Sequence, residues 1–470
     1  MFLKFKSIAI GILEILYILN TCNSHEHNFI KNSWEKLPGI VNSQASSFIN
    51  NSGNFIHSVG QNAFKISITD VINKSKCVIP SNANNIVRAA LIQQCVSPSL
   101  GYGNETRCFD ELGCFPMEYP WTSVLRPLPQ PMKPEEVGTK IFLYTSKHKE
   151  QYNVTLWPNI SIEGSDFDAD RNYTVFLVHG FLNDTTDVWM ANLKDAYLKK
   201  RDANFFLVDW GLGAHQMNYL QVASNTRIVG AELTRLGKFL IDQYKLDPSK
   251  IHLMGHSLGA QVSSYFAKTF PGIYRITAFD PAQPGFEGCS KEVRLDKSDA
   301  KFVDVIHTSG RPFIPLLGCG FVGPVGHVDI YVNGGMMQPK CTWPQMEING
   351  LKDISDLATI SMNVMRDWII CSHQKAIWYF LESLDDSCII WARKINTIPI
   401  PLSNVAIGVF KPFIPPPKKC APGECLPIGL NTDKYSVQGI FYAETMDVAP
   451  YCKLDLETNR LMGILSNLHL

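Results

Sequence analysis

The chain has 470 residues, of which 45% are hydrophobic and 18% are charged, and 43 basic side chains balance 43 acidic ones. Such a composition is typical of a globular protein, and the length predicts about two to three domains. A net charge of zero excludes the strongly basic classes that bind nucleic acids or other polyanions. No stretch beyond the first 24 residues approaches about 18 uninterrupted apolar residues, so no transmembrane anchor is expected.

Residues 1–24 have the pattern of a secretory signal peptide. A basic start precedes an apolar run from Ile8 to Leu19, and small residues allow cleavage after Ser24. The apolar run is too short to span a bilayer, which disfavours a membrane anchor. We therefore expect a secreted, extracellular protein.

Cysteines and glycosylation sequons agree with secretion. One of the 13 cysteines falls in the signal segment, which leaves an even number suited to disulfides in an oxidising compartment. N-x-S/T sequons, which are potential acceptors for glycosylation and also arise by chance, occur at Asn50, Asn73, Asn104, Asn153, Asn159, Asn172 and Asn183.

Residues 25–107 form a leader in which apolar residues recur at helical spacing. The segment fits a propeptide, an interfacial amphipathic helix or an accessory helical layer. We favour the accessory layer or pro-segment because Ser, Asn and Gln outnumber Lys and Arg on its polar side, unlike most membrane-surface helices.

Residues 108–390 alternate between strand-like and helical segments. Cys108 and Cys114 bound a short loop that a disulfide could close. The strand-like segments are 140–145, 173–178, 204–210, 251–254, 275–279 and 302–307, and the helical ones include 188–199 and 228–244. This alternation predicts an α/β fold with a mostly parallel sheet covered by helices on both faces.

Residues 391–470 differ in composition from the preceding region. Prolines are frequent between 395 and 430, and helical periodicity is weak, so a loop-rich, disulfide-stapled extension with a small core is expected. Cys420 and Cys425 are candidates for a disulfide there. The sequence leaves the pairing of Cys388 and Cys452 open.

The segment 251–270 has the strand–turn–helix context of a nucleophile elbow, with Ser257 at the centre of a G-x-S-x-G pentapeptide. Gly255 and Gly259 are explained by a turn too tight for side chains on either flank. The following helix would direct its free amides toward a developing oxyanion. A bare G-x-S-x-G match is more often a loop, and the flanking elements are what favour the elbow.

In α/β-hydrolases the catalytic acid follows the nucleophile and the histidine follows the acid. Asp280 ends the strand after the elbow helix, at the sheet edge where Ser257 also lies. Asp304 and Asp329 are rivals, although Asp304 lies inside an apolar run and is expected to make a structural contact.

Several histidines compete for the catalytic role. His373 follows Cys371 and precedes a helical run, so a disulfide could fix its loop, whereas the rivals are His252, His256, His307 and His327. In the catalytic role His373 would take the Ser257 proton and return it, while Asp280 orients the imidazole. The oxyanion donors would be the backbone amides of Phe181 and Leu258.

Ordered motifs across residues 108–380 resemble the pancreatic-lipase family of neutral lipases, which are α/β-hydrolases. They are C-F-D-E-L-G-C-F (108–115), V-H-G-F (178–181), V-D-W (208–210), R-I-V-G-A-E (227–232), G-H-S-L-G-A (255–260), F-D-P-A (279–282), R-L-D-K-S-D-A-K-F-V-D-V-I-H-T (294–308), G-H-V-D (326–329), N-G-G (333–335) and C-S-H (371–373). The resemblance implies Ser257, Asp280 and His373 as the triad, and Phe181 and Leu258 as oxyanion donors.

The resemblance also implies a structural calcium site, although the chemistry itself needs no cofactor. Its ligands would be the side chains of Asp296 and Asp299 and the backbone carbonyls of Lys291 and Arg294, an oxygen-only set suited to a hard cation. The family usually has Glu in place of Lys291, and a nearby ammonium would weaken binding.

Two inserts bear on the substrate. The resemblance implies that Cys341 and Cys371 close an apolar lid, which either rolls onto lipid or stays packed as a helical cap. It implies that Cys289 and Cys319 brace a second loop, 308–325. A long lid with a long second loop is typical of triacylglycerol lipases, and phospholipase-selective members have both shortened.

The C-terminal region departs from the pancreatic enzymes, which add a β-sandwich domain that binds lipid and colipase. The chain has no room for that domain, so colipase dependence is not expected. The sequence predicts a secreted lipase acting on acyl-glycerol esters at a lipid–water interface. A phospholipase A1 or galactolipase is the alternative, and a yolk-type lipid-binding protein without turnover is disfavoured because all three triad positions are filled.

Overall fold

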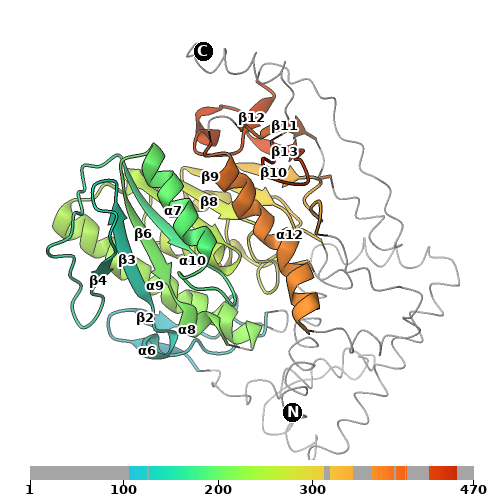
Figure 1. The fold of residues 1–470 in the computed structure, drawn as a ribbon. Coiled ribbons are helices and arrows are strands. Elements are labelled where there is room, and N and C mark those ends of the chain that lie inside the picture. Colours follow the sequence, from blue (N-terminus) through green and yellow to red (C-terminus); the bar gives the residue numbers. More distant parts are fainter. Residues whose placement is uncertain are drawn as a thin grey trace, which may run out of the picture.

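The computed structural model of the chain describes residues 105–123, 126–216, 218–311, 318–341, 362–385, 388–396, 398–399 and 423–452 (Figure 1). The predicted signal peptide, all but the last three residues of the predicted leader, and most of the predicted lid lie outside these residues. Parts of the second loop and of the C-terminal extension lie outside them too.

One large sheet of eleven strands organises the described residues, in the order β12-β11-β13-β10-β9-β8-β7-β5-β6-β3-β4. The run from β13 to β6 is parallel, and antiparallel strands complete both edges. The strands are β3 (Lys140–Thr145), β4 (Tyr152–Val154), β5 (Tyr173–Val178), β6 (Ala203–Asp209), β7 (Ile251–His256), β8 (Arg275–Phe279), β9 (Phe302–His307), β10 (Val328–Val332), β11 (Trp391–Ile395), β12 (Cys425–Pro427) and β13 (Gly439–Ala443). The expected mostly parallel sheet is confirmed.

Helices cover both faces of this sheet (Figure 1). On one face α9 (Tyr219–Tyr244) and α10 (Leu258–Ala267) pack against alternate strand residues such as Phe176. On the other face α7 (Val188–Lys200) and α12 (Met362–Glu382) pack against the intervening residues such as Leu177. Because neighbouring residues of a strand point to opposite faces, strands buried on both faces read as continuous apolar runs.

Short elements surround this core. They are β1 (Arg107–Phe109), β2 (Gly113–Phe115), α6 (Pro134–Val137), α8 (Gly211–Ala214) and the 3₁₀ turns η2 (Pro248–Lys250), η3 (Lys291–Val293), η4 (Lys297–Asp299) and η7 (Thr432–Lys434). The helices in the described part of the chain are all too short or too polar to cross a bilayer.

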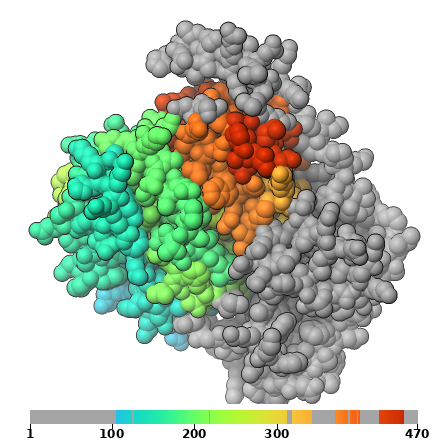
Figure 2. Space-filling model, viewed as in Figure 1, coloured from blue at the N-terminus to red at the C-terminus, as the bar shows by residue number. Residues whose placement is uncertain are grey.

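The region after residue 390 differs from the expected loop-rich extension. Its strands β11, β12 and β13 continue the main sheet, and Phe441 and Leu426 are fully buried in the core beside α12. The Cys388–Cys452 disulfide joins the chain just before β11 to the chain after β13. Figure 2 shows the last described residues, in red, lying directly against α12, in orange. The large parallel sheet supplies the backbone partners that these short strands need, which a small separate core could not provide.

Candidate active site

Ser257 occupies a tight turn between β7 and α10. Its backbone has φ 57° and ψ −121°, a conformation that costs free energy for a residue with a side chain. A Cβ atom on Gly255 would lie 2.4 Å from the carbonyl oxygen of Gly259, and one on Gly259 would lie 2.2 Å from that of Val178. Both positions therefore require glycine, as the elbow predicts.

Four adjacent parallel strands end at one edge of the sheet, and a predicted or observed site residue follows each of them. Ser257 follows β7, Asp280 follows β8, Phe181 lies just beyond β5, and Ser309 lies just beyond β9. The Ser257 amide donates to the carbonyl of the last β8 residue at 3.0 Å. Crevices outside the carboxyl ends of parallel strands are where such folds bind ligands.

Asp280 is completely buried, and its carboxylate accepts several hydrogen bonds. The Nδ1 atom of His373 lies 2.6 Å from Oδ2. The amides of Thr308 and Ser309 donate to Oδ1 at 2.8 and 3.1 Å, and the Ser309 hydroxyl donates to Oδ2. Burial alone would raise the pKa of Asp280, but the bonds from His373, Ser309 and Thr308 hold it below its ordinary value. Asp280 is therefore ionised at neutral pH.

Ser309 is a site residue that the sequence reasoning missed. Besides bonding to Asp280, its hydroxyl lies 3.3 Å from His373 Nδ1 and accepts from the Gly320 amide at 3.0 Å. A Cβ atom on Gly320 would lie 2.2 Å from the Asp280 carboxylate, so glycine is required there as well. The available signal was the position of Ser309 two residues after a buried strand.

His373 lies within α12, whereas the sequence led us to expect a loop before a helical run at 375–381. The helix includes position 373 because no glycine or proline interrupts Met362–Glu382. The Cys341–Cys371 disulfide closes two residues before His373, as expected of its tether. The structure thus brings His373 and Asp280 into contact from elements far apart in the chain.

His256, next to Ser257, packs against His373. Its Nε2 atom lies 3.2 Å from the His373 carbonyl oxygen, and the two ring centroids are 4.5 Å apart. Burial, with a smaller contribution from His373, lowers the pKa of His256 to about 3, so its ring is neutral at physiological pH. A neutral ring can pack against His373 without opposing a positive charge there.

The two proposed oxyanion donors flank Ser257. Leu258 is the first residue of α10, where backbone amides lack intrahelical partners. Gly180 precedes Phe181, and a Cβ atom on Gly180 would lie 2.7 Å from the Ser257 Cβ. The chain at residues 180–181 therefore approaches Ser257 closely, while the Phe181 ring packs against Tyr219 at 5.3 Å between centroids.

The rival acids and histidines have structural partners. Asp304 accepts two hydrogen bonds from the buried Arg275 guanidinium, at 2.7 and 2.8 Å, which is the structural contact expected of it. Asp329 lies 2.9 Å from His307. His252 bonds to Thr277, and His327 accepts from the Val303 amide.

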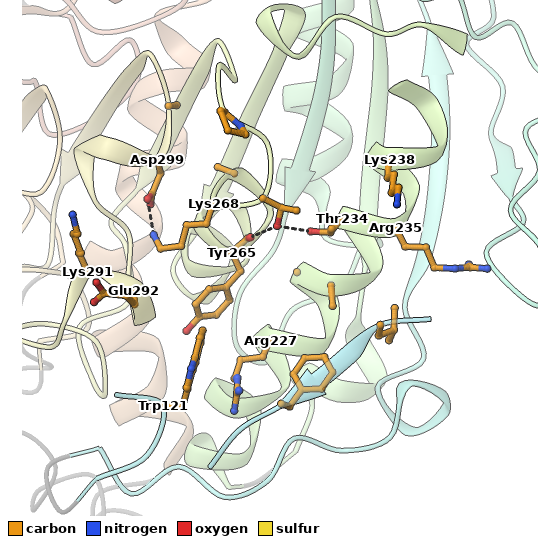
Figure 3. A pocket seen from close by; sticks show the side chains of 18 of the residues that line it. Trp121, Arg227, Thr234, Arg235, Lys238, Tyr265, Lys268, Lys291, Glu292 and Asp299 are labelled. Atoms are coloured by element: carbon orange, nitrogen blue, oxygen red, sulfur yellow. Dashed lines mark hydrogen bonds and ion pairs between the residues drawn. The ribbon is translucent and has the colours of Figure 1, made fainter. Parts of the chain in front are cut away.

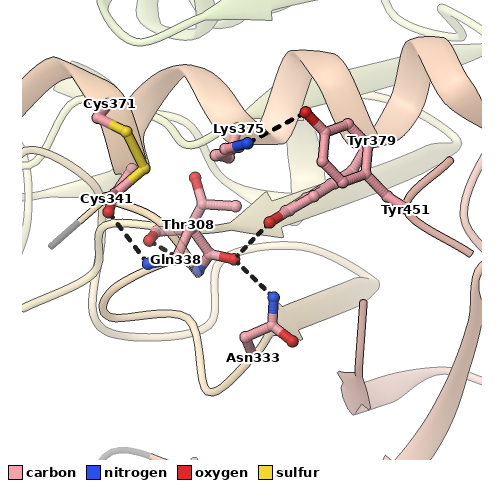
Figure 4. The surroundings of a disulfide bond; sticks show 9 residues. Thr308, Asn333, Gln338, Cys341, Cys371, Lys375, Tyr379 and Tyr451 are labelled. Carbon is pink, nitrogen blue, oxygen red and sulfur yellow. Dashed lines mark hydrogen bonds between the residues drawn. A yellow bond between two sulfur atoms is a disulfide. The ribbon is translucent and has the colours of Figure 1, made fainter. Parts of the chain in front are cut away.

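The disulfide at the base of the predicted lid is embedded in a hydrogen-bonded network (Figure 4). The side-chain amide of Gln338, three residues before Cys341, donates to the backbone carbonyl oxygens of Thr308 and Val332. Its side-chain oxygen accepts from the Tyr379 hydroxyl and the Asn333 amide. This network joins the Cys341–Cys371 bond to the residue that precedes Ser309.

The remaining candidate cysteines differ in outcome. Cys108 is bonded to Cys114. Cys425 is disulfide-bonded, and Cys420 lies outside the described residues. The structure does not join Cys289 to Cys319: the Cys289 thiol donates to the Gly285 carbonyl, and Cys319 is a thiol whose pKa burial raises to about 12.

The residues predicted to hold calcium do not fit a metal in their present arrangement. The Nζ atom of Lys268 bonds to Asp299 Oδ1 at 2.5 Å (Figure 3). It also bonds to the Arg294 carbonyl at 3.0 Å, so it occupies two of the four expected ligand atoms. Asp296 turns its carboxylate to Ser298 and Arg294 instead. Within the described ranges no three His, Cys, Asp or Glu side chains cluster as metal ligands would.

Comparisons with known proteins identify a matching family and several relatives. Residues 105–398 match the family described as Lipase. The human protein named inactive pancreatic lipase-related protein 1 is 40% identical over 280 residues, which cover 59% of this chain and 58% of that protein. Human pancreatic triacylglycerol lipase is 34% identical over 354 residues, covering 74% of this chain and 72% of that one.

A third relative, pancreatic lipase-related protein 2 of Bos taurus, is 39% identical over 281 residues, covering 59% of this chain and 58% of that protein. The match therefore spans less than two thirds of the length of the first and third of these relatives.

Proposed function

Since this chain belongs to the lipase family, we propose that it is a secreted serine hydrolase that cleaves acyl-glycerol carboxylic esters, with triacylglycerol as the substrate. The single observation that carries the proposal is the 2.6 Å contact between His373 Nδ1 and Asp280 Oδ2 at the sheet edge where Ser257 sits on its elbow. Lipases of this family need no cofactor for the chemistry.

The arrangement supports a two-step acyl transfer. Asp280 holds the proton on His373 Nδ1, which leaves Nε2 to accept the Ser257 proton as Oγ attacks the ester carbonyl carbon. The amides of Leu258 and Phe181 donate to the carbonyl oxygen as it becomes negative. His373 returns the proton to the departing glyceride oxygen, and Ser257 keeps the acyl group as an ester. Water, activated by the same imidazole, then releases the fatty acid and restores the serine.

Secretion is supported by the signal pattern of residues 1–24 and by the sequons. Of the four sequons within the described residues, Asn153, Asn159 and Asn172 are exposed. Exposed asparagines are accessible to glycosylation, so a mass increase that is removed by a glycosidase is the expected readout.

The names of the relatives raise a second candidate, a protein of this fold without turnover, because one relative is named as inactive. The filled triad and the Asp280–His373 contact favour activity. Ser257→Ala should remove both labelling by an organophosphonate and fatty-acid release from emulsified triglyceride, while the protein is still secreted. The matched control is Ser263→Ala on the same helix, whose hydroxyl donates to the Gly259 carbonyl at 2.9 Å and which should retain both activities.

Retained labelling in the Ser257→Ala protein would refute the assignment of the nucleophile. A wild-type protein that neither labels nor hydrolyses would favour the lipid-binding alternative. The phospholipase A1 or galactolipase alternative is separated by comparing acyl release from triglyceride, phosphatidylcholine and galactolipid with one preparation. We expect triglyceride to be hydrolysed fastest.

A further inference from the structure

The C-terminal end of the elbow helix carries a lysine that is bound by oxygen atoms. Lys268 caps α10, and its Nζ atom donates to the Ser264 hydroxyl at 2.8 Å, to the Arg294 carbonyl at 3.0 Å and to Asp299 Oδ1 at 2.5 Å. These three acceptors use all three protons of an ammonium group. Figure 3 shows the Lys268 side chain directed across the cavity wall to Asp299.

Asp299 has no carboxylate oxygen left without a partner. Its Oδ1 atom accepts from Lys268, and its Oδ2 atom accepts from the Ser264 hydroxyl at 2.8 Å and from the Asp296 amide at 3.0 Å. The Asp299 side chain is only 3% exposed, so an unpaired charge there would be costly. The Lys268 ammonium supplies the positive charge that this buried carboxylate requires.

A divalent cation would compete for these same atoms. Calcium needs six to eight oxygen ligands at about 2.3–2.6 Å, and it would have to displace the ammonium from both Asp299 and the Arg294 carbonyl. Segment 291–299 carries three basic and three acidic side chains, so Lys268 leaves this group with a positive charge that disfavours a further cation. The segment 291–299 is thus already attached to α10 through a charge that belongs to the chain.

We propose that the Lys268 ammonium takes the place of a divalent cation, so that the 291–299 segment is held on the elbow helix without metal. The position of the ammonium among carboxylate, carbonyl and hydroxyl oxygens is what a hard cation would occupy. The chain should therefore be indifferent to chelators and to calcium. Stability and ion binding at this segment do not depend on whether Ser257 turns over ester.

The test uses the full-length secreted protein and follows its melting temperature in EDTA and in calcium chloride. The wild-type melting temperature should be the same in both. Lys268→Ala should melt several degrees lower in EDTA and recover in calcium, because an open set of oxygens now accepts the ion. Lys268→Ala with Asp299→Asn should lose that recovery. Lys238→Ala, an exposed lysine lining the same cavity of about 1030 Å³, should behave as wild type.

Terbium luminescence gives a second readout that does not depend on stability. Tyr265 donates to the Val293 carbonyl at 2.7 Å, so its ring is placed to sensitise a lanthanide bound by this segment. Terbium emission should appear in Lys268→Ala. It should stay at background in the wild-type protein and in the control Lys238→Ala. Destabilisation of the wild-type protein by EDTA would overturn the proposal even if the variant did not fold. A folded Lys268→Ala that neither binds terbium nor recovers in calcium would overturn it too.

Discussion

Asp280→Asn separates the proposed catalytic role of this residue from its structural one. The Asp280 Oδ1 atom accepts from the amides of Thr308 and Ser309, and an amide oxygen can take its place. The new NH₂ group then stands where Oδ2 was, 2.6 Å from His373 Nδ1. Because an NH₂ group only donates there, the imidazole proton must move to Nε2, the atom that should receive the Ser257 proton.

The expected loss follows from the tautomer. The same substitution in the Ser-His-Asp template lowers kcat by about 10⁴, and at 1.36 kcal/mol for each factor of ten this is about 5 kcal/mol of transition-state stabilisation. Stability should change little, because the two backbone bonds persist and the side chain keeps its volume. Ester turnover is measured with a water-soluble p-nitrophenyl ester, and folding by thermal melting.

Asp304→Asn is the matched control, since it neutralises an equally buried carboxylate. Asp304 lies on β9, two strands away from β7 and the serine that follows it. Asp304 pairs with Arg275, and their side chains are 2% and 1% exposed. Leaving a buried charge without any partner costs about 3–5 kcal/mol, but Arg275 keeps its second ion pair, with Asp433 at 3.3 Å, so Asp304→Asn should lower stability by less than that. The rate per folded molecule should not change. The reasoning fails if Asp280→Asn keeps its rate within tenfold of wild type, or if folded Asp304→Asn loses turnover.

Three further predictions concern stability. Gly259→Ala should prevent folding, because its Cβ would lie 2.2 Å from a carbonyl oxygen. The control Gly323→Ala, whose Cβ would have its nearest atom at 3.4 Å, should melt at the wild-type temperature. Equal melting of the two variants would contradict the packing argument. Burial raises the pKa of Glu232 to about 7 from 4.5, so its carboxyl stays protonated in the folded state while it ionises in the unfolded chain. The free energy of unfolding should therefore fall as pH rises from 4.5 to 7. Glu232→Gln should remove that loss, so that at pH 8 the variant is about 3 kcal/mol more stable than wild type in denaturant titrations. The same pH profile in the variant and the wild type would contradict this prediction. Replacing Cys341 and Cys371 together by Ser opens a loop of 30 residues and should lower stability by about 3–4 kcal/mol, and an unchanged denaturation midpoint would count against the closure argument.

The parts of the site that the sequence could predict are local. Ser257 and Asp280 each follow a strand whose apolar run is readable, and parallel strands place their carboxyl ends at one edge. The glycines at 255 and 259 encode a turn that no other residue can make. The order of these local signals was enough to predict the α/β-hydrolase core and its elbow.

The parts that could not be predicted depend on contacts between distant segments. The residues alone left His373 as one of several histidines, and the family resemblance singled it out. The packing of α12 against the sheet is what brings its ring to Asp280. The strands β11 to β13 are short and separated by prolines, and they are stabilised by an existing sheet edge. Lys268 and Asp299 are 31 positions apart, and nothing in either residue's neighbourhood indicates that the ammonium fills the cation position.

One relative is named as inactive, and the presence of a triad alone does not establish turnover of lipid. The hydrogen bonds on Asp280 orient His373 in the resting protein, but turnover of lipid also requires a carbonyl carbon to reach Ser257. These two requirements can fail independently, because the hydrogen bonds of the triad do not by themselves let a lipid ester reach the serine. A small organophosphonate tests the chemistry, and emulsified triglyceride tests the chemistry together with access. Labelling at Ser257 without triglyceride hydrolysis would therefore place the defect in access, whereas the absence of both would place it in the triad or the oxyanion donors.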